Sequence, residues 1–187
     1  MGTMKDAKTY GGIGAILMLV GAFFAPVGIV GLILLFISVK TIADITKDRK
    51  IFDHFLYYFI LAIVAMIAMG AMMFSAFFAA GGFDPAQITT GVGIMVIASL
   101  VVGWIFFVLS SLYLRKSYTA IYEKTNVDAF RTTGTLYFIG ALLTIVVVGL
   151  IIIFVARIFE IIAYFGLPDD YAEKPMAGTE QPVERIV

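Results

Sequence analysis

The stretch that decides the fold lies between residues 132 and 166 and reads TTGTLYFIGALLTIVVVGLIIIFVARIFEIIAYFG. Its first 25 residues carry no charge, and the apolar run continues beyond Arg157 and Glu160. About 17 to 25 apolar residues in a helix cross a bilayer core of about 30 Å, because a helix satisfies its own backbone where lipid offers no water. We therefore predict a membrane-spanning helix over residues 132–165.

The composition of the whole chain agrees with a membrane protein. Of its 187 residues 61% are hydrophobic and 14% are charged, and the mean hydropathy is +1.03. Soluble domains contain about 45 to 50% apolar residues, so most of this surface must face lipid. Basic and acidic residues number 13 each, which gives no reason to expect a nucleic-acid partner. The chain has no cysteine and one histidine, so we expect no metal site and no cofactor.

Three further uncharged runs occupy residues 9–39, 55–83 and 85–114. They predict spans over about 10–39, 55–83 and 86–114, in addition to 132–165. These spans form one transmembrane domain, residues 10–166, between an N-terminal polar segment at 1–9 and a polar C-terminal tail at 167–187. The predicted fold is an all-α, polytopic helical bundle with four long spans.

The first run leaves the number of crossings open. Its 31 residues would measure about 46 Å as one helix, which exceeds the bilayer core. Pro26 would kink such a helix, or the chain would turn back as a hairpin at Ala25 to Gly28. No small-x-small cleavage site precedes Pro26, so we expect this segment to be retained. Hairpins in the first or last segment would give five or six spans, but the similar run lengths favour four.

Charge predicts the orientation. The connections 40–54 and 115–131 each hold four basic residues, and the short connection at 81–90 holds none. By the positive-inside rule the two basic connections are cytoplasmic, in a multi-pass protein of the cell membrane. Four crossings place both termini outside, whereas a hairpin in the first segment would return Lys5 and Lys8 to the cytoplasm. Tyr118, Ile121 and Tyr122 predict a surface helix that anchors at the headgroups or meets a partner.

Small residues recur at helical spacing and predict where helices pack closely. Three sets stand out: Gly14, Gly21 and Gly28; Ala71, Ser75 and Ala79; and Ser99 with Gly103. For the glycine set, coincidence is an equal alternative, since glycine is common in membrane helices. Trp104 lies well inside its run and is expected to pack between helices. The methionines of residues 66–73 indicate adaptable filler in preference to a soft-metal site.

Arg157 and Glu160 are the ionisable residues embedded in an apolar run. Their i, i+3 spacing places them on one helix face, where they form a candidate intramembrane charge pair. In a single crossing Arg157 would reach the far headgroups, which favours interface anchoring over an ion or proton path. A hairpin turning at Gly149 would place the pair in mid-membrane and reverse that preference.

Two pieces of the chain echo each other. Residues 13–17 (IGAIL) are echoed by 139–143 (IGALL), and 31–36 (GLILLF) by 149–154 (GLIIIF). Duplication is one explanation, and chance resemblance between apolar helices is the favoured one. With single crossings, a duplicated pair would run in opposite directions, as in transporters with inverted repeats.

The same motifs resemble a known family. The run 31–36 leads into KTIAD at 40–44 and RKIF at 49–52, and TGTLYFIGALLTI at 133–145 is followed by Gly149. Over residues 10–168 these resemble an uncharacterised, mainly archaeal membrane-protein family, domain of unknown function 996. The resemblance implies a membrane-embedded fold and brings no known activity or functional residues. Arg157 and Glu160 depart from the apolar helix expected there.

The sequence supports a function only in outline. It shows no nucleophile with a neighbouring base and no phosphate-binding glycine loop, so we do not expect an enzyme. We expect a small structural or accessory membrane protein that acts by helix association, as a homo-oligomer or as a subunit of a larger membrane complex, with lipids around it. The alternative is an oligomeric channel or transporter for ions or small solutes, lined by Ser75, Ser99, Ser110, Ser111, Thr144 and the charge pair.

Overall fold

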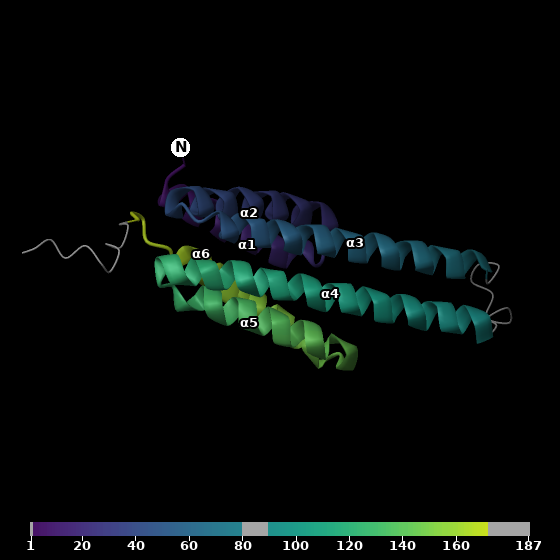
Figure 1. Cartoon of the computed structure of the whole chain (residues 1–187). Coiled ribbons are helices and arrows are strands. Elements are labelled where there is room, and N and C mark those ends of the chain that lie inside the picture. The colour runs from purple at the N-terminus through teal and green to yellow at the C-terminus, as the bar shows by residue number, and fades with distance from the viewer. Residues whose placement is uncertain (1, 80–89, 172–187) are drawn as a thin grey trace, which may run out of the picture.

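The computed structural model describes residues 2–79 and 90–171, and these form a bundle of helices (Figure 1). In chain order they are α1 (Met4–Gly21), α2 (Ala25–Thr46), α3 (Arg49–Ala79), α4 (Thr90–Thr125), α5 (Asp128–Leu143), the 3₁₀ turn η2 (Thr144–Val146) and α6 (Val148–Phe165). The described ranges contain no strand, so the predicted all-α bundle is confirmed. Residues 81–89 of the predicted turn and 172–187 of the predicted tail lie outside the described residues.

The first apolar segment is a hairpin, and the single span predicted over 10–39 is wrong. α1 ends at Gly21, and α2 begins at Ala25 with Pro26 in its first turn. Proline lacks an N–H group, and the first N–H groups of a helix have no partner within the helix. Pro26 therefore starts a new helix and does not kink a continuous one.

The last apolar segment is also a hairpin. α5 ends at Leu143, η2 follows, and α6 begins at Val148 after Val147 adopts a left-handed φ of 64°. The single span predicted over 132–165 is therefore wrong, and the hairpin alternative near Gly149 applies. Arg157 consequently lies on the returning helix and not at the far headgroups.

The central pair α3 and α4 is much longer than the other helices. They contain 31 and 36 residues, about 46 and 54 Å at the rise of an α-helix. α4 runs through Arg115 to Thr125, so these residues do not form the separate surface helix that was predicted. Leu114, Tyr118 and Ile121 are buried on one face of this extension, which packs into the bundle.

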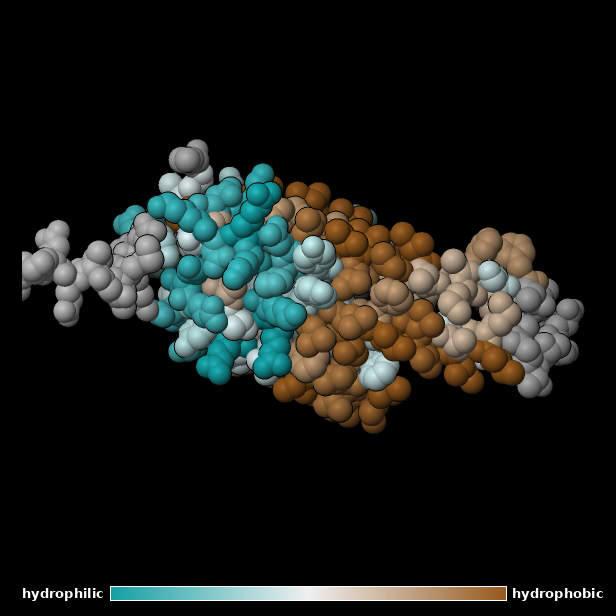
Figure 2. All heavy atoms as spheres, viewed as in Figure 1, coloured by the Kyte–Doolittle hydropathy of each residue, from teal (hydrophilic) through white to brown (hydrophobic). Residues whose placement is uncertain are grey.

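The helices surround a common core in chain order, because each packs against the next and α1 packs against α6. The beginning of α1, the end of α6, and the α2–α3 and α4–α5 connections all lie at one end of the bundle (Figure 1). The hydrophilic residues gather at the same end, and the rest of the visible face is hydrophobic (Figure 2). We call this end the polar cap. Lys5 and Lys8 thus share it with the two basic connections.

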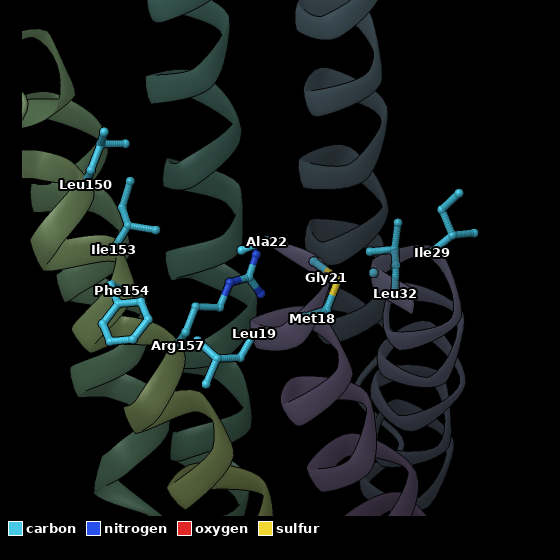
Figure 3. Close-up of a pocket in the computed structure, with 11 residues that line it drawn as sticks. Met18, Leu19, Gly21, Ala22, Ile29, Leu32, Leu150, Ile153, Phe154 and Arg157 are labelled. Carbon is cyan, nitrogen blue, oxygen red and sulfur yellow. The ribbon is translucent and has the colours of Figure 1, made fainter. Parts of the chain in front are cut away.

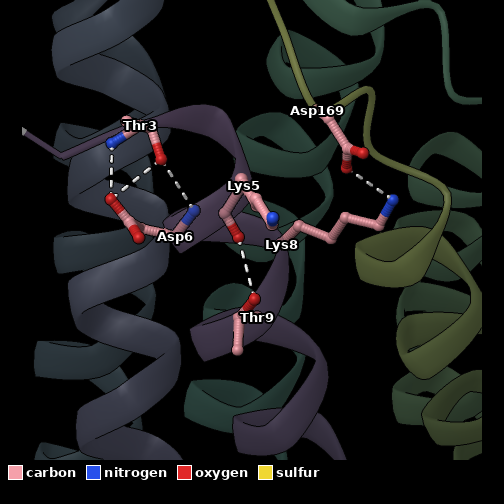
Figure 4. A network of polar contacts seen from close by, with 6 residues as sticks. All are labelled: Thr3, Lys5, Asp6, Lys8, Thr9 and Asp169. Atoms are coloured by element: carbon pink, nitrogen blue, oxygen red, sulfur yellow. Dashed lines mark hydrogen bonds and ion pairs between the residues drawn. The ribbon is translucent and has the colours of Figure 1, made fainter.

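The first turn of α1 is tied to the polar cap by polar contacts (Figure 4). Thr3 and Asp6 form a capping box. The backbone N–H and the hydroxyl of Thr3 both donate to the Asp6 carboxylate, and these hydrogen bonds lower the pKa of that carboxyl. Lys8 donates to Asp169 across 2.9 Å and lowers the pKa of that carboxyl as well. This ion pair joins the beginning of α1 to the segment after α6.

Five helices among the described residues are long and apolar enough to cross a membrane. They cover Pro26–Thr46, Arg49–Phe78, Gly93–Thr125, Asp128–Val146 and Val148–Phe165. Five such helices agree with a polytopic helical bundle. The sixth helix, α1, is not among the five and packs between α2 and α6.

Candidate functional site

The centre of the bundle contains an ion pair between Arg157 and Glu160. Both residues lie on α6, and Arg157 Nη1 is 2.9 Å from Glu160 Oε2. The side chain of Glu160 is 2% exposed and that of Arg157 is 19% exposed. The predicted charge pair is therefore formed and lies inside the protein, with only Arg157 partly accessible.

Tyrosines from two other helices complete the coordination of the carboxylate. The Tyr118 hydroxyl on α4 donates to Glu160 Oε1, and the Tyr137 hydroxyl on α5 donates to Oε2 across 3.1 Å. The Arg157 guanidinium also lies over the Tyr137 ring, 5.0 Å from its centre. One carboxylate thus holds three helices together through charge-assisted hydrogen bonds. We call Arg157, Glu160, Tyr118 and Tyr137 the core network.

Two further tyrosines surround the core network. Tyr58 on α3 lies within electrostatic reach of Arg157 and Glu160. Tyr164, one turn after Glu160, is fully buried, and its ring packs edge-on against Tyr118 and Phe130. Its hydroxyl has no hydrogen-bond partner of normal geometry among the described residues. The carboxylate of Glu160 is therefore surrounded by aromatic rings and protected from water, whereas Arg157 stays partly accessible.

A cavity of about 530 Å³ lies next to the ion pair, on the side away from the polar cap. The guanidinium of Arg157 points across it toward Gly21 and Ala22 at the turn of the first hairpin (Figure 3). Ile153 and Phe154 of α6 line the opposite wall (Figure 3). Arg157 is the one charged residue among those that line this otherwise apolar space.

The chemistry available at this site is narrow. Both oxygens of Glu160 already accept hydrogen bonds, and one of them also faces the guanidinium. Within the described parts of the chain, no three His, Asp or Glu side chains come together as metal ligands would. The arrangement is suited to holding helices in a fixed relation through a neutral pair of buried charges.

The predicted packing glycines lie at helix contacts, but not along one continuous helix. A Cβ atom on Gly14 would lie 2.9 Å from the carbonyl oxygen of Gly31, and one on Gly28 would lie 3.3 Å from the Cα of Gly21. Gly21 ends α1 and Gly28 lies in the first turn of α2. These two glycines therefore face each other across the turn of the first hairpin. A Cβ on Gly103 would lie 2.9 Å from Met69 Sδ, at the α3–α4 contact.

The other predicted packing residues divide into buried and exposed positions. Ser99 is buried on α4, where its hydroxyl donates to the carbonyl of Val96. Ala71 and Ser75 are exposed on α3, and the side chain of Ala79 lies outside the described residues. Ala71 and Ser75, the described members of this stripe, thus face away from the other described helices.

The polar residues predicted to line a pathway bond to the backbone. Ser75, Ser99 and Ser111 each donate to a carbonyl of their own helix, and Thr144 donates to the carbonyl of Gly140 in the preceding turn of α5. Ser110 donates across 3.0 Å to the carbonyl of Tyr58 on α3. These contacts stabilise helices and helix pairs, and they do not arrange the hydroxyl groups around a common path.

Sequence reasoning missed the tyrosines of the core network. Tyr118 was expected at the headgroups, but it is fully buried. Trp104, in contrast, lies between helices as expected and donates to the Ala141 carbonyl of α5 across 3.0 Å. A signal was present, because a carboxylate embedded in an apolar helix requires hydrogen-bond donors from elsewhere in the chain. Tyrosine was the abundant donor near the span ends.

Comparison with known proteins places the chain in a family. The model described as "Protein of unknown function (DUF996)" matches residues 27–158, from α2 to the residue after Arg157. The chain is also 40% identical over 172 residues to an uncharacterized protein of Methanocaldococcus jannaschii, covering 89% of this chain and 94% of that relative. No solved structure matches. The motifs at residues 31–52 and 133–149 suggested this family from the sequence. The chain therefore belongs to the uncharacterised DUF996 family.

Proposed function

We propose that the protein is a non-enzymatic, multi-pass protein of the cell membrane that acts by associating with further copies of itself through the α3–α4 hairpin. The observation that carries this proposal is the projection of α3 and α4 beyond the other helices (Figure 1). Thr144, at the end of α5, lines one cavity with Met69 and Gly103. Beyond this level, within residues 2–79 and 90–171, each long helix packs against the other one alone (Figure 1).

The projecting surface is suited to helix association in lipid. Ser75 is exposed there, one turn after the exposed Ala71. Small side chains at four-residue spacing let two backbones approach closely, which is the main source of helix association where lipid and protein are equally apolar. Large exposed side chains surround them, such as Ile67 and Phe74 at 64% and 65% exposure.

A cysteine crosslink tests this proposal directly, because the natural chain contains no cysteine. We expect Ser75→Cys, a change of nearly equal volume, to form a disulfide between two copies in native membranes treated with a mild oxidant. The matched control is Met73→Cys, which is also exposed at this level of α3 but lies about 160° away from Ser75 around the helix. The measurement is the proportion of dimer on a non-reducing gel.

Two results would contradict the proposal. One is equal crosslinking of Ser75→Cys and Met73→Cys, which indicates random collision. The other is a crosslink only to a different protein, which would favour the accessory-subunit form of helix association over self-association.

The alternative of an oligomeric channel or transporter receives less support from the geometry. The hydroxyl groups proposed to line its path are engaged by backbone carbonyls, and Glu160 is enclosed by tyrosines. A path within one chain would have to break these contacts.

A further inference from the structure

A second polar cavity lies between the beginning of α3 and the end of α4, outside the core network. Its volume is about 450 Å³, and Lys50, His54, Arg115 and Lys116 contribute its basic groups. Asp48 and Glu123 are the acidic residues that line it. We call this space the basic cavity.

The acidic residues do not neutralise the basic cavity. Asp48 Oδ1 accepts the backbone N–H of Lys50 across 3.1 Å, and Asp48 Oδ2 lies 3.6 Å from Lys124 Nζ. Its charge is thus balanced by a lysine outside the lining. Three permanent cations and Glu123 remain, so the cavity has an excess of positive charge.

Aromatic rings hold two of the cations in place. The Lys116 ammonium lies 5.0 Å from the centre of the Tyr113 ring, and the Arg115 guanidinium lies 5.5 Å from that of Phe138. Cation–π contact positions a charged group without an acidic partner. Both cations therefore keep hydrogen-bond donors for an anion from outside the chain.

The histidine points to a missing partner. His54 Nδ1 is buried and has no hydrogen-bond partner among the described residues. A buried polar atom without a partner is costly, by about 1 to 3 kcal/mol. An oxygen-rich anion that entered the cavity would accept a hydrogen bond from the ring N–H and relieve this cost.

The position of the basic cavity identifies the kind of anion. One turn further along α3, the Tyr57 ring lies tilted against the Tyr113 ring with ring centres 5.4 Å apart, and Tyr57 is 54% exposed. Aromatic rings of this kind mark the level of the lipid headgroups. Exposed apolar side chains continue from there into the membrane region, with Ile60 and Val64 on α3 and Leu109 and Ile105 on α4.

We propose that the basic cavity binds the phosphate group of an anionic membrane lipid, whose apolar chains lie along the exposed faces of α3 and α4. Basic pockets between helices on the cytoplasmic side are suited to such headgroups. Lys50, Lys116 and His54 bind the phosphate oxygens, and Tyr57 lies beside the first carbons of the chains. This site is independent of the proposed self-association, which uses the opposite end of the hairpin.

Native mass spectrometry of the detergent-solubilised full chain tests the proposal. The protein is mixed with equal amounts of phosphatidylglycerol and phosphatidylcholine, and the lipid retained on each molecule is counted. We expect one phosphatidylglycerol to be retained preferentially. The double variant Lys50→Gln, Lys116→Gln should bind it at least about tenfold more weakly, because two charge-assisted hydrogen bonds are lost.

Three controls make the result decisive. Lys5→Gln removes a charge from the same end of the bundle without touching the cavity, and should leave retention unchanged. His54→Asn leaves every permanent charge in place and should still weaken retention. Thermal unfolding of each variant near the wild-type midpoint shows that the fold is kept.

Several outcomes would overturn the proposal. Equal retention of the two lipids would remove the preference for an anionic headgroup, and equal losses from Lys5→Gln would indicate general attraction to the polar cap. Displacement of the lipid by inorganic phosphate at equal concentration would assign the cavity to free phosphate.

Discussion

At the scale of single residues, the core network concentrates its interactions on one carboxylate. Glu160 accepts from Arg157 on its own helix, from Tyr118 on α4 and from Tyr137 on α5. Removing a charge from water is costly, and this cost is offset only when every lone pair finds a good donor. Because the donors come from three helices, the carboxylate also fixes how those helices lie relative to one another.

The ion pair yields a prediction about stability. Glu160→Gln leaves the Arg157 charge buried without its partner, so we expect the free energy of unfolding to fall by about 3 to 5 kcal/mol. The double variant Arg157→Met, Glu160→Leu removes both charges and should recover most of that loss. Unfolding in detergent can be followed by the fluorescence of Trp104, the one tryptophan of the chain.

The double variant also serves as the control for the single one. If Glu160→Gln were as stable as the natural chain, the ion pair would contribute nothing to the fold. If the double variant lost as much stability as Glu160→Leu and Arg157→Met lose together, each measured against the natural chain, the charges would act independently of each other.

The charge pair could be predicted from the sequence, and its partners could not. Arg157 and Glu160 are separated by one turn of a single helix, so their spacing alone places them together. Tyr118 is 42 residues from Glu160, and its approach depends on how α4 and α6 each pack against α5. The periodicity of residues 118–122 indicated an apolar face, but that pattern does not distinguish lipid from the protein interior.

At the scale of elements, the two hairpins are built on the same contact. Gly14 faces Gly31 across the first hairpin, and Gly140 faces Gly149 across the last one. These are the glycines of the two echoed motifs, so the echo marks where the arms of each hairpin approach. Both hairpins begin at the polar cap, however, and the expectation that the echoed segments run in opposite directions is wrong.

These glycine contacts predict that glycine-to-alanine substitutions will differ in their effect on thermal stability according to position. Gly14→Ala would place a methyl group 2.9 Å from Gly31 O, and Gly140→Ala would place one 3.0 Å from Gly149 O. Backbone atoms cannot move aside without separating the arms, so both variants should unfold at lower temperature. Gly70→Ala meets nothing within 4 Å and should be neutral or stabilising by up to about 1 kcal/mol.

The measurement is the midpoint of thermal unfolding for the three variants under one detergent condition. A fall for Gly70→Ala equal to that of the other two would mean that glycine is needed for helix flexibility and not for close approach. Unchanged midpoints for Gly14→Ala and Gly140→Ala would mean that the arms are farther apart than in the structure.

The helices could be predicted from the sequence more readily than the turns between them. Long uncharged runs favour helix wherever lipid surrounds them, which located every apolar segment. Whether such a run continues or turns back depends on a few residues, and Pro26 is compatible with both outcomes. In the last segment no proline or charge interrupts the run at Thr144 to Val147, so the turn there has no signal in composition.

At the scale of the whole molecule, the hairpins and the central pair differ in how far they reach into lipid. Measured from the polar cap, the uncharged parts of α1 (residues 9–21) and α5 (residues 132–143) contain 13 and 12 residues, which is about 20 and about 18 Å of helix. The uncharged part of α4 from Thr90 to Leu114 measures about 37 Å. Three of the shorter helices are long and apolar enough to cross when their whole length is counted. From the lengths of the uncharged parts, however, we expect α3 and α4 to cross a bilayer core of about 30 Å and the four shorter helices to enter it only partly.

This difference predicts a topology with two complete crossings and two hairpins that enter and leave on the cytoplasmic side. Single cysteines can be introduced freely, since the natural chain has none. A cysteine replacing Phe24 or Val146, at the ends of the hairpins farthest from the polar cap, should react with a membrane-impermeant maleimide from neither side. Asp84→Cys, in the connection between α3 and α4, should react from outside, and Lys5→Cys should react only after the membrane is opened.

The two hairpin positions are the decisive ones, because they distinguish this topology from six full crossings. In six crossings the ends of both hairpins would reach the outer surface, where Phe24→Cys and Val146→Cys would react from outside like Asp84→Cys. Protection of both positions in intact cells, together with reaction of both after denaturation in detergent, would locate them within the lipid. Lys5→Cys reacting from outside would reverse the orientation that the basic residues of the polar cap predict.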